Sequence, residues 1–535
     1  MPFVFALIMV MGIFLGFQIR EFTGGKKVFV GQLGYDRLEE VMSLIKAKYV
    51  DTLNSESLSD KTISQLLSNL DPHSYFIPAS EVQGVKESLE GNFEGIGIEF
   101  YLNKDTIFVV SPISGGPSEA VGIKAGDKII KIEDSTVAGV HITNDQVMKK
   151  LRGKKGTEVK VTVARLGSKK LIDFTIVRDK IPLFSVDAGY MVDKEIGYIR
   201  VNRFAATTYE EFMKELTKLK KAGMSKLILD LRQNPGGILE IAIMMADEFI
   251  SGRQLLLYTE GKSEKRRDYT AKADGDFEGG DIVVLIDEGS ASASEIVAGA
   301  LQDWDRGLII GRRSFGKGLV QEQFPLSDGS EVRLTVARYY TPSGRCIQKP
   351  YGNDLKDYYD ETNARFEHGE FQSMDSLNFP DSLKYKTIHG RTVYGGGGIV
   401  PDIFVPLDTA NWLYMAEVRS HIPQFVYSYY FEHQKEFEAY KANSYFRDNF
   451  QITDQLYRTF LNYAEKEGLE IDAKKLRSID KQVKTTLKAS IARQMWKEEG
   501  YYSVINEIDP TFQKAYLTLK DPKAVTLLRP HKAVD

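Results

Sequence analysis

The pattern of apolar and polar positions changes several times along the chain, and each change predicts a different kind of element. Between residues 33 and 89, apolar side chains such as Leu38, Val41 and Tyr49 recur at spacings of three and four, which predicts helices with a packed face. From about residue 91 the apolar runs become short and are punctuated by glycine, as in β-strands. Beyond residue 180, strands and amphipathic helices such as 208–221 alternate, which predicts an α/β region.

Length and charge limit what else the protein can be. The 535 residues predict three or four domains, each large enough to bury a core. The net charge of -4 is small and the charged residues are interleaved, which argues against nucleic acid as a partner. The single cysteine, Cys346, excludes an internal disulfide and is interpreted as structural rather than nucleophilic.

The first residues form an apolar segment. Residues 2–19 carry no charge, and about 18 apolar residues are near the lower limit for a helix that crosses a bilayer. No basic stretch precedes the segment and no A-x-A cleavage pattern follows it, so we expect an uncleaved membrane anchor rather than a removed signal peptide. The alternative is a buried core helix.

Glycine punctuation is densest in the small β-rich region. The segment FEGIGIEF, residues 93–100, places apolar residues around two glycines, which would let a peptide end approach backbone N–H groups. Together with the AGDKIIKI pattern at 125–132 and the helical stretch 144–151, it resembles a PDZ domain. PDZ domains bind extended C-terminal peptides along a sheet edge and hold the carboxylate in a backbone nest. The resemblance implies a tail-binding loop made of Gly95, Ile96, Gly97 and Ile98. The alternative is a small β-rich module without a ligand.

Two loops of the α/β region follow buried strands. The first, RQNPGG at 232–237, joins a strand to a helix and can point backbone N–H groups at an anion, such as the oxyanion of an acyl-transfer reaction. Taken alone, it is better explained as an ordinary turn between a strand and a helix. The second, GSASASE at 289–295, sets three serines at a helix start. Ser292 can project from that turn, but Ser290 and Ser294 compete because serine also caps helices.

A lysine between glycines follows the serine run. Lys317 lies in a segment, 311–318, that nearly matches a phosphate loop, but Gly318 replaces the hydroxyl residue that would bind magnesium. Residues 319–324 look extended rather than helical, which also disfavours a nucleotide site. A lysine that acts as a general base must be neutral, and burial lowers its pKa while a polar neighbour such as Gln321 orients the amine.

These segments together resemble the C-terminal processing peptidases, over about residues 35–408. The motifs are DPHSY, DLRxNPGG, GSASASEI and FGKGxVQ, in that order, around the PDZ resemblance. The family resemblance implies that Ser292 is the nucleophile, Lys317 the base and Gln321 the residue that positions the amine. It also implies an oxyanion hole made by the backbone N–H of Ala293 and of Gly236 or Gly237. No metal or cofactor is expected.

The resemblance implies a multi-domain α+β architecture: a crotonase/ClpP-like α/β protease core with an inserted PDZ domain, an N-terminal helical segment and a C-terminal helical extension. The expected limits are a membrane anchor or signal segment at 1–20, a helical region at 33–88, a PDZ domain at 89–178, a protease core at 179–408 and a helical extension at 409–535. The polar insert at about 351–385 is expected to be a surface loop, and His73 a turn or packing residue.

The function expected from the resemblance is a serine endopeptidase that recognises apolar protein C-termini through the PDZ domain. It also implies an extracytoplasmic location on the periplasmic side, tethered to the inner membrane, with a homo-oligomer or a regulatory partner possible. Two other classes remain open. One is a PDZ-containing scaffold that binds tails without cutting them, and the other is a membrane-associated nucleotide-binding protein built on the loop around Lys317.

Overall fold

The computed structural model describes residues 35–526, apart from 104, 114, 166, 273, 353–354 and 378. The expected membrane segment, residues 1–20, lies outside the described residues. Among those described, no helix has both the length and the apolar character needed to cross a membrane. The chain divides into two compact units, residues 1–66 and residues 67–535.

The first unit contains helix α2 (Tyr35–Lys48) and most of α3 (Ser55–Ser68). Both follow the expected helical spacing, but the expected packed face of α2 is wrong for the described chain. Leu38, Val41 and Tyr49 are 45%, 50% and 55% exposed. Two short helices have too little surface to cover each other's apolar side chains. The periodicity therefore predicted which face of α2 is apolar, but not whether another element packs against that face.

The second unit begins with β1 (Tyr75–Ile77) and α4 (Ala79–Glu90) and then enters a small module bounded by a two-stranded ribbon. The ribbon pairs β2 (Asn92–Gly95) with β9 (Asp179–Pro182), so both ends of the module leave the rest of the unit side by side. Its antiparallel sheet has the order β3-β4-β5-β7-β8, with β6 paired to β5. The elements are β3 (Ile98–Asn103), β4 (Thr106–Pro112), α5 (Pro117–Ala120), β5 (Lys128–Ile132), β6 (Ser135–Thr136), α6 (Asn144–Leu151), β7 (Glu158–Ala164) and β8 (Ile172–Val177).

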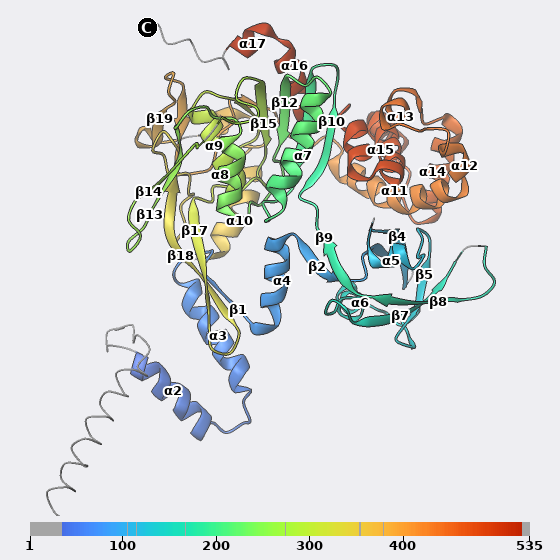
Figure 1. Cartoon of the computed structure of the whole chain (residues 1–535), viewed down its shortest axis with the longest axis horizontal. Coiled ribbons are helices and arrows are strands. Elements are labelled where there is room, and N and C mark those ends of the chain that lie inside the picture. Colours follow the sequence, from blue (N-terminus) through green and yellow to red (C-terminus); the bar gives the residue numbers. More distant parts are fainter. Residues whose placement is uncertain are drawn as a thin grey trace, which may run out of the picture. The chain divides into compact units, whose positions relative to one another are not determined.

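A six-stranded sheet is mostly parallel and has the order β10-β11-β12-β15-β16-β21, with β10 antiparallel at one edge. Its strands β10, β12 and β15 are labelled in Figure 1. Its strands are β10 (Val186–Met191), β11 (Ile196–Val201), β12 (Lys226–Asp230), β15 (Asp281–Ile286), β16 (Leu308–Gly311) and β21 (Ile403–Phe404). Alternate residues face opposite sides of a strand, so Leu227 and Leu229 join one buried cluster and Ile228 another. Both faces of this sheet are therefore covered.

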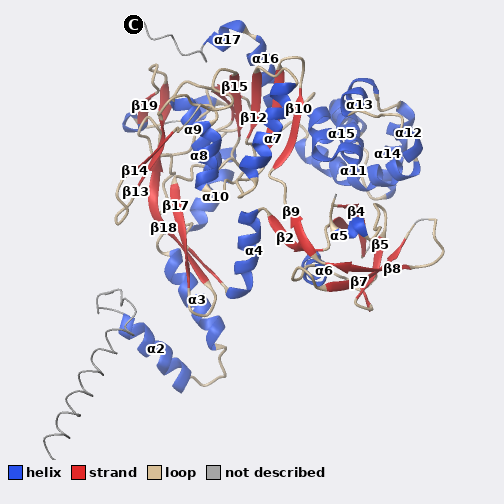
Figure 2. Ribbon diagram, in the orientation of Figure 1, coloured by secondary structure: helices blue, strands red, loops and turns tan. Residues whose placement is uncertain are grey.

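Helices cover the two faces. The cluster of Leu227 also holds side chains of α7 (Thr208–Lys221), α8 (Leu239–Asp247) and α9 (Ala293–Asp303), which lie on one face in Figure 2. The cluster of Ile228 includes Phe512, Ala515 and Leu519 of α16 (Pro510–Lys520). The C-terminal region thus contributes directly to the core that holds the α/β sheet.

A second sheet of the same unit carries the order β1-β18-β13-β14, and β17 pairs with β18. Its further strands are β13 (Leu255–Glu260), β14 (Arg267–Thr270), β17 (Leu319–Pro325) and β18 (Glu331–Tyr340). The extended conformation expected for residues 319–324 is confirmed by β17. Because β1 pairs with β18, residues near 75 lie beside residues near 333, although the two segments are far apart in the sequence.

The polar insert is not a surface loop, contrary to the expectation. It contains α10 (Leu355–Glu367), the 3-10 turns Met374–Ser376 and Asp381–Leu383, and β19 (Lys384–Lys386), which pairs with β20 (Thr392–Tyr394). Tyr358, Arg365 and Glu370 are buried. The charges are paired: Arg365 and Arg313 both contact the carboxylate of Glu370 at 2.7 Å. A polar composition therefore did not mean exposure here, because the ion pairs allow burial.

The C-terminal extension is helical, as expected. It consists of α11 (Trp412–Glu432), α12 (Gln434–Phe437), α13 (Asn443–Asn449), α14 (Asp454–Lys466), α15 (Ala473–Ile505), α16 and α17 (Pro522–Thr526). Tyr429 and Tyr430 pack against its own apolar cluster. The turns of α15 are interrupted at Trp496 and Lys497, whose backbone angles are not helical. Tyr502, beyond this kink, accepts a hydrogen bond at its carbonyl from the Tyr190 hydroxyl of β10 at 3.2 Å.

Candidate active site

The serine run forms the connection between β15 and α9. Ser292 immediately precedes α9 and has φ +54° and ψ -112°, a backbone conformation that residues with a side chain rarely adopt. Such strain persists only where the surrounding structure holds it, and it is typical of functional turns. The conformation sets Ser292 at the carboxyl edge of a parallel sheet, where ligands of open α/β sheets bind.

The structure distinguishes among the three serines that the sequence left open. Ser290 and Ser294 are fully buried, and each uses its hydroxyl to hold the neighbouring loop. Ser290 Oγ donates to the carbonyl of Leu231 at 2.8 Å, and Ser294 Oγ donates to the carbonyl of Asn234 at 2.9 Å. Ser292 is only partly buried. The geometry therefore favours Ser292 as the serine that can meet a substrate.

Lys317 lies in the loop between β16 and β17 and is partly buried. Burial lowers its pKa to about 8, helped by the positive charge of Arg333 and opposed by the carboxylates of Glu295 and Asp71. Removal from water disfavours the charged ammonium form. A substantial fraction of Lys317 is therefore neutral in mildly alkaline solution, as a general base requires.

The carboxylate of Glu295 joins the serine turn to the lysine loop. Its Oε2 accepts the backbone N–H of Ser292 at 2.8 Å and the backbone N–H of Lys317 at 2.9 Å. Its Oε1 accepts from Gly316 N at 2.7 Å and from Ser314 Oγ. Glu295 is fully buried, and burial raises its pKa although these hydrogen bonds oppose the shift. A single buried side chain thus holds the backbones of both candidate catalytic residues.

This role of Glu295 was missed in the sequence, where the residue served only to mark a helix start. The spacing did contain a signal. A serine followed three residues later by glutamate at a helix start is a capping pattern in which the glutamate reaches back to the serine amide. The contacts of Glu295 with residues 314–317 could not be predicted, because no pattern in the sequence near Glu295 indicates them.

The proline-glycine loop lies against the serine turn. A Cβ built on Gly236, whose φ is +97°, would stand 2.8 Å from Ser292 Cβ and 2.9 Å from the amide of Ala293. The N–H of Gly236 already donates to Asn234 Oδ1 at 2.9 Å. That bond favours Gly237 over Gly236 as the partner of Ala293 in an oxyanion hole, a choice that the sequence left open.

Two further residues that the sequence singled out are Gln321 and His73. Gln321, on β17, donates from Nε2 to Thr335 Oγ1 of β18 at 3.4 Å. His73 Nε2 is 2.8 Å from the Tyr358 hydroxyl, and the rings meet edge to face. Burial and the nearby charge of Lys317 lower the pKa of His73 to about 4, so it is neutral at physiological pH. His73 thus packs, as expected, but it does so beside the lysine.

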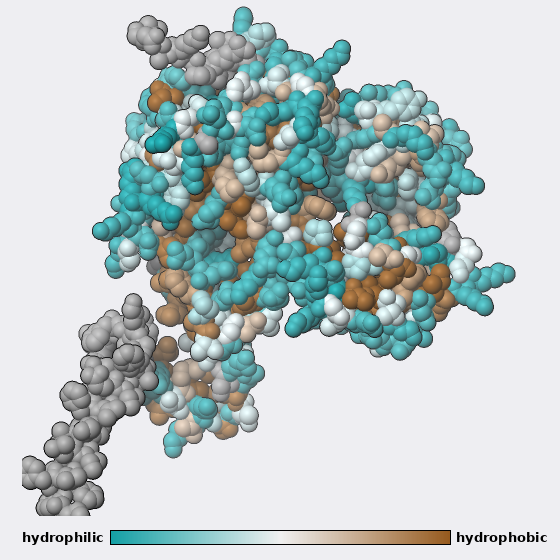
Figure 3. Space-filling model, in the orientation of Figure 1, coloured by the Kyte–Doolittle hydropathy of each residue, from teal (hydrophilic) through white to brown (hydrophobic). Residues whose placement is uncertain are grey.

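The predicted tail-binding loop opens the small module. Gly97 has φ +71°, and a Cβ there would meet Ile181 at 2.8 Å, so the turn requires glycine. Ile96 is buried and its carbonyl accepts from Ser118 Oγ at 2.6 Å, while Gly95 ends β2. Ile98 begins β3, which is the end strand of its described sheet. Figure 3 shows apolar surface near α5 and α6 of this module.

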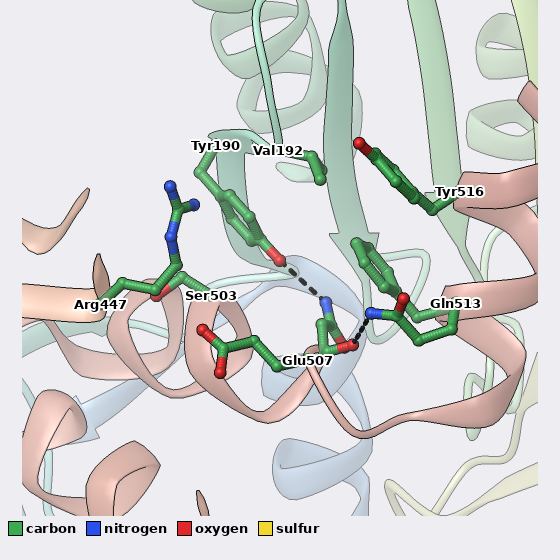
Figure 4. Close-up of a pocket in the computed structure, with 9 residues that line it drawn as sticks. Tyr190, Val192, Arg447, Ser503, Glu507, Gln513 and Tyr516 are labelled. Carbon is green, nitrogen blue, oxygen red and sulfur yellow. Dashed lines mark hydrogen bonds between the residues drawn. The ribbon is translucent and has the colours of Figure 1, made fainter. Parts of the chain in front are cut away.

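Two cavities lie outside the serine turn itself. One, of about 340 Å³, follows β18 and is lined in part by Leu319, Thr335 and Arg338. The other, of about 230 Å³, is bounded by Tyr190, Glu507 and Tyr516 and contains no residue of the serine or lysine loops (Figure 4). Within residues 35–526 as described, no group of histidine, cysteine and acidic side chains is arranged to hold a metal ion.

Comparison with known proteins identifies two regions of the chain. A family model described as peptidase family S41 matches residues 195–355, and a PDZ domain model matches residues 95–176. A carboxy-terminal-processing protease of Bartonella bacilliformis is 38% identical over 316 residues, which cover 58% of this chain and 72% of that protein. The chain belongs to peptidase family S41.

A second curated relative and one solved structure are also similar to this chain. The carboxy-terminal processing protease CtpA of Bacillus subtilis is 37% identical to this S41 peptidase over 335 residues, covering 61% of the chain and 69% of the relative. The solved structure of a photosystem II D1 C-terminal processing protease is 26% identical, with a TM-score of 0.37, and covers 72% of this chain and 89% of that one. Residues 414–497 match a model of a family of unknown function.

Proposed function

We propose that this S41 peptidase is a serine endopeptidase that cuts proteins by a Ser292/Lys317 dyad after recognising their C-terminal tails. The observation that carries the proposal is the shared carboxylate of Glu295, which holds the amides of Ser292 and Lys317 on one oxygen atom. A serine in a strained turn and a lysine with a lowered pKa are the two parts that this chemistry needs.

The reaction begins with neutral Lys317, which takes the proton of the Ser292 hydroxyl as Oγ attacks the scissile carbonyl carbon. The N–H groups of Ala293 and Gly237 stabilise the oxyanion of the tetrahedral intermediate. When that intermediate collapses, the peptide C–N bond breaks and the Lys317 ammonium returns its proton to the leaving amine. Water then attacks the acyl ester with Lys317 again as base, and the serine is released.

The tail-binding step uses the small module. A peptide that adds to the outer edge of β3 would extend its sheet, with its carboxylate at the loop of Gly95, Ile96, Gly97 and Ile98. Ile98, Phe100 and Leu102 pack on the module's apolar cluster, which supports a preference for apolar tails. A PDZ domain model matching this region supports the same binding mode.

We also propose the finer architecture and the location. The paired strands β2 and β9 at the two ends of the module support a PDZ domain inserted ahead of a crotonase/ClpP-like core. The apolar segment 2–19 supports tethering to the inner membrane with the protease on the periplasmic side. A homo-oligomer or a regulatory partner is part of the same proposal.

The test compares cleavage of an unfolded protein with an apolar tail by the wild type, three serine-to-alanine variants and one lysine-to-alanine variant. Ser292→Ala and, separately, Lys317→Ala should abolish cleavage without changing the thermal unfolding midpoint. Ser290→Ala and Ser294→Ala are the matched controls, because they remove buried structural hydroxyls and should lower stability by about 1 kcal/mol each while cleavage persists. Cleavage that survives Ser292→Ala in purified protein would overturn the proposal. A wild type that binds tails but never cuts them would favour the scaffold function.

A further inference from the structure

Thr335 of β18 is held by the turn that precedes β1. Its hydroxyl donates to Asp71 Oδ1 at 3.0 Å, and its backbone N–H donates to Ser74 Oγ at 3.0 Å. Ser74 Oγ in turn donates to Asp71 Oδ2 at 2.5 Å. Asp71 and Ser74 are buried and Thr335 is partly buried, so little water competes for these bonds. The turn thus fixes both the backbone and the side chain of Thr335.

The direction of these bonds determines how Gln321 is oriented. A threonine hydroxyl has one proton, and here that proton goes to a carboxylate, which can only accept. Thr335 Oγ1 must therefore accept its second hydrogen bond, and the donor is Gln321 Nε2 at 3.4 Å. The two ends of a glutamine carboxamide are distinguished by their hydrogen-bond partners. With the NH2 group on Thr335, the carbonyl oxygen is the end of Gln321 left for another donor.

We propose that Asp71 and Thr335 are positioning residues of the general base, because they fix the carboxamide of Gln321 so that its oxygen accepts from the amine of Lys317. This inference rests on the proposed Ser292/Lys317 mechanism. With an N–H of the amine held by Gln321, the nitrogen lone pair is directed at the serine hydroxyl. The arrangement extends the base to four residues, in the order Asp71, Thr335, Gln321 and Lys317.

Strand pairing brings the members of this chain together. Gln321 and Thr335 are directly opposite each other in the β17–β18 ladder, next to a register irregularity at Val320. Strand β1, which begins one residue after Ser74, pairs with the neighbouring part of β18. Asp71 also acts on the lysine directly, since its charge raises the pKa of Lys317. The other charged or titratable groups that act on this lysine are Glu295, Arg333 and His73.

The first experiment removes the Thr335 hydroxyl at constant shape. Thr335→Val should lower kcat for a quenched-fluorescent peptide with an apolar tail by about ten- to a hundredfold, with KM little changed, because orientation of the base is lost. Thr335→Ser keeps the hydroxyl and should stay near the wild type. Thr162→Val is the matched control: Thr162 is buried and also donates from a strand to an aspartate, Asp173 Oδ1 at 2.6 Å, but lies in the small module.

The second experiment asks whether Thr335 acts through Gln321. In a Gln321→Ala background the positioning role no longer exists, so adding Thr335→Val should reduce kcat by less than about twofold. A merely structural threonine would reduce kcat by the same factor in both backgrounds, and that result would overturn the proposal.

The third experiment separates the effect of the Asp71 charge from its effect on the orientation of Thr335. It also tests the proposal if Thr335→Val fails to fold. Asp71→Asn retains an oxygen that can accept from Thr335 but loses the charge, so the acidic limb of the kcat/KM profile should move to lower pH. If the acidic limb of the Asp71→Asn profile stays where it is in the wild type, Asp71 does not act on the general base. Full activity of Thr335→Val beside an inactive Ser292→Ala would refute this inference alone, whereas an active Ser292→Ala would refute the proposed function on which it rests.

Discussion

Glu295 accepts the backbone amide of Lys317 at 2.9 Å on the same oxygen that accepts the amide of Ser292. The candidate nucleophile and base are thereby positioned by one carboxylate that contacts neither side chain of the pair through these bonds. Replacement by glutamine keeps the size but puts an NH2 group where an acceptor is needed.

Glu295→Gln should therefore reduce the rate of cleavage at least about a hundredfold. It should also lower the free energy of unfolding by about 1–3 kcal/mol, because a buried N–H loses its acceptor. Cleavage assays and urea unfolding, with Ser292→Ala as an inactive but stable reference, measure the two effects. Wild-type activity in Glu295→Gln would mean that the two loops keep their places without the carboxylate.

The pKa of Lys317, lowered to about 8, predicts the pH dependence of cleavage. The base works in its neutral form, so the active fraction increases as pH rises toward this value. We expect kcat/KM to rise about tenfold per pH unit below pH 8 and to level off above it. A profile measured at constant ionic strength checks this. A limb near pH 4 would instead indicate His73, whose pKa is lowered to about 4, and His73→Gln would then be the variant to measure.

The contact of Gly236 with the serine turn predicts that even one methyl group is excluded. Gly236→Ala would place Cβ 2.7 Å from the carbonyl oxygen of Ala291 and 2.8 Å from Ser292 Cβ. Gly236→Ala should abolish cleavage. It should also lower the free energy of unfolding by more than the cost of the positive φ alone, because the added Cβ clashes with the serine turn. Gly252→Ala is the control, because Gly252 also has a positive φ, +72°, but no atom lies within 4 Å of its added Cβ. That variant should lose only about 1–2 kcal/mol and remain active. Equal behaviour of the two variants would contradict the assignment.

Helix α16 offers a matched pair for the role of the C-terminal region. Leu519 is fully buried against the α/β sheet, whereas Leu517 on the same helix is 62% exposed. Leu519→Ala should cost about 2–5 kcal/mol of stability, while Leu517→Ala should stay within about 0.5 kcal/mol. Thermal unfolding followed by circular dichroism measures both. Similar losses in the two variants would show that α16 does not pack as described.

How much of this could be predicted from the sequence depended on how local each feature is. The helix expected at 208–221 is α7 with the same limits, and the strand expected at 319–324 lies within β17, because apolar periodicity is a local property. The three serines looked alike because their difference lies in what their hydroxyls touch. The role of Thr335 had no signal at all: its partner Asp71 is 264 residues away in the sequence. Polar composition misled at 351–385, where paired charges are buried.

The position of α16 on the sheet has a consequence for how the protein is made. One face of the sheet, which includes Ile228, Val283 and Ile310, is covered by side chains from residues 512–519, near the end of the chain. Arg232, directly after β12, likewise pairs with Asp509 at 2.7 Å. A ribosome synthesises the chain from its N-terminus, so this apolar face stays uncovered until residues 512–519 have emerged, well after the last strand of the sheet. The order of synthesis thus delays completion of this side of the core until the C-terminal helices have been made.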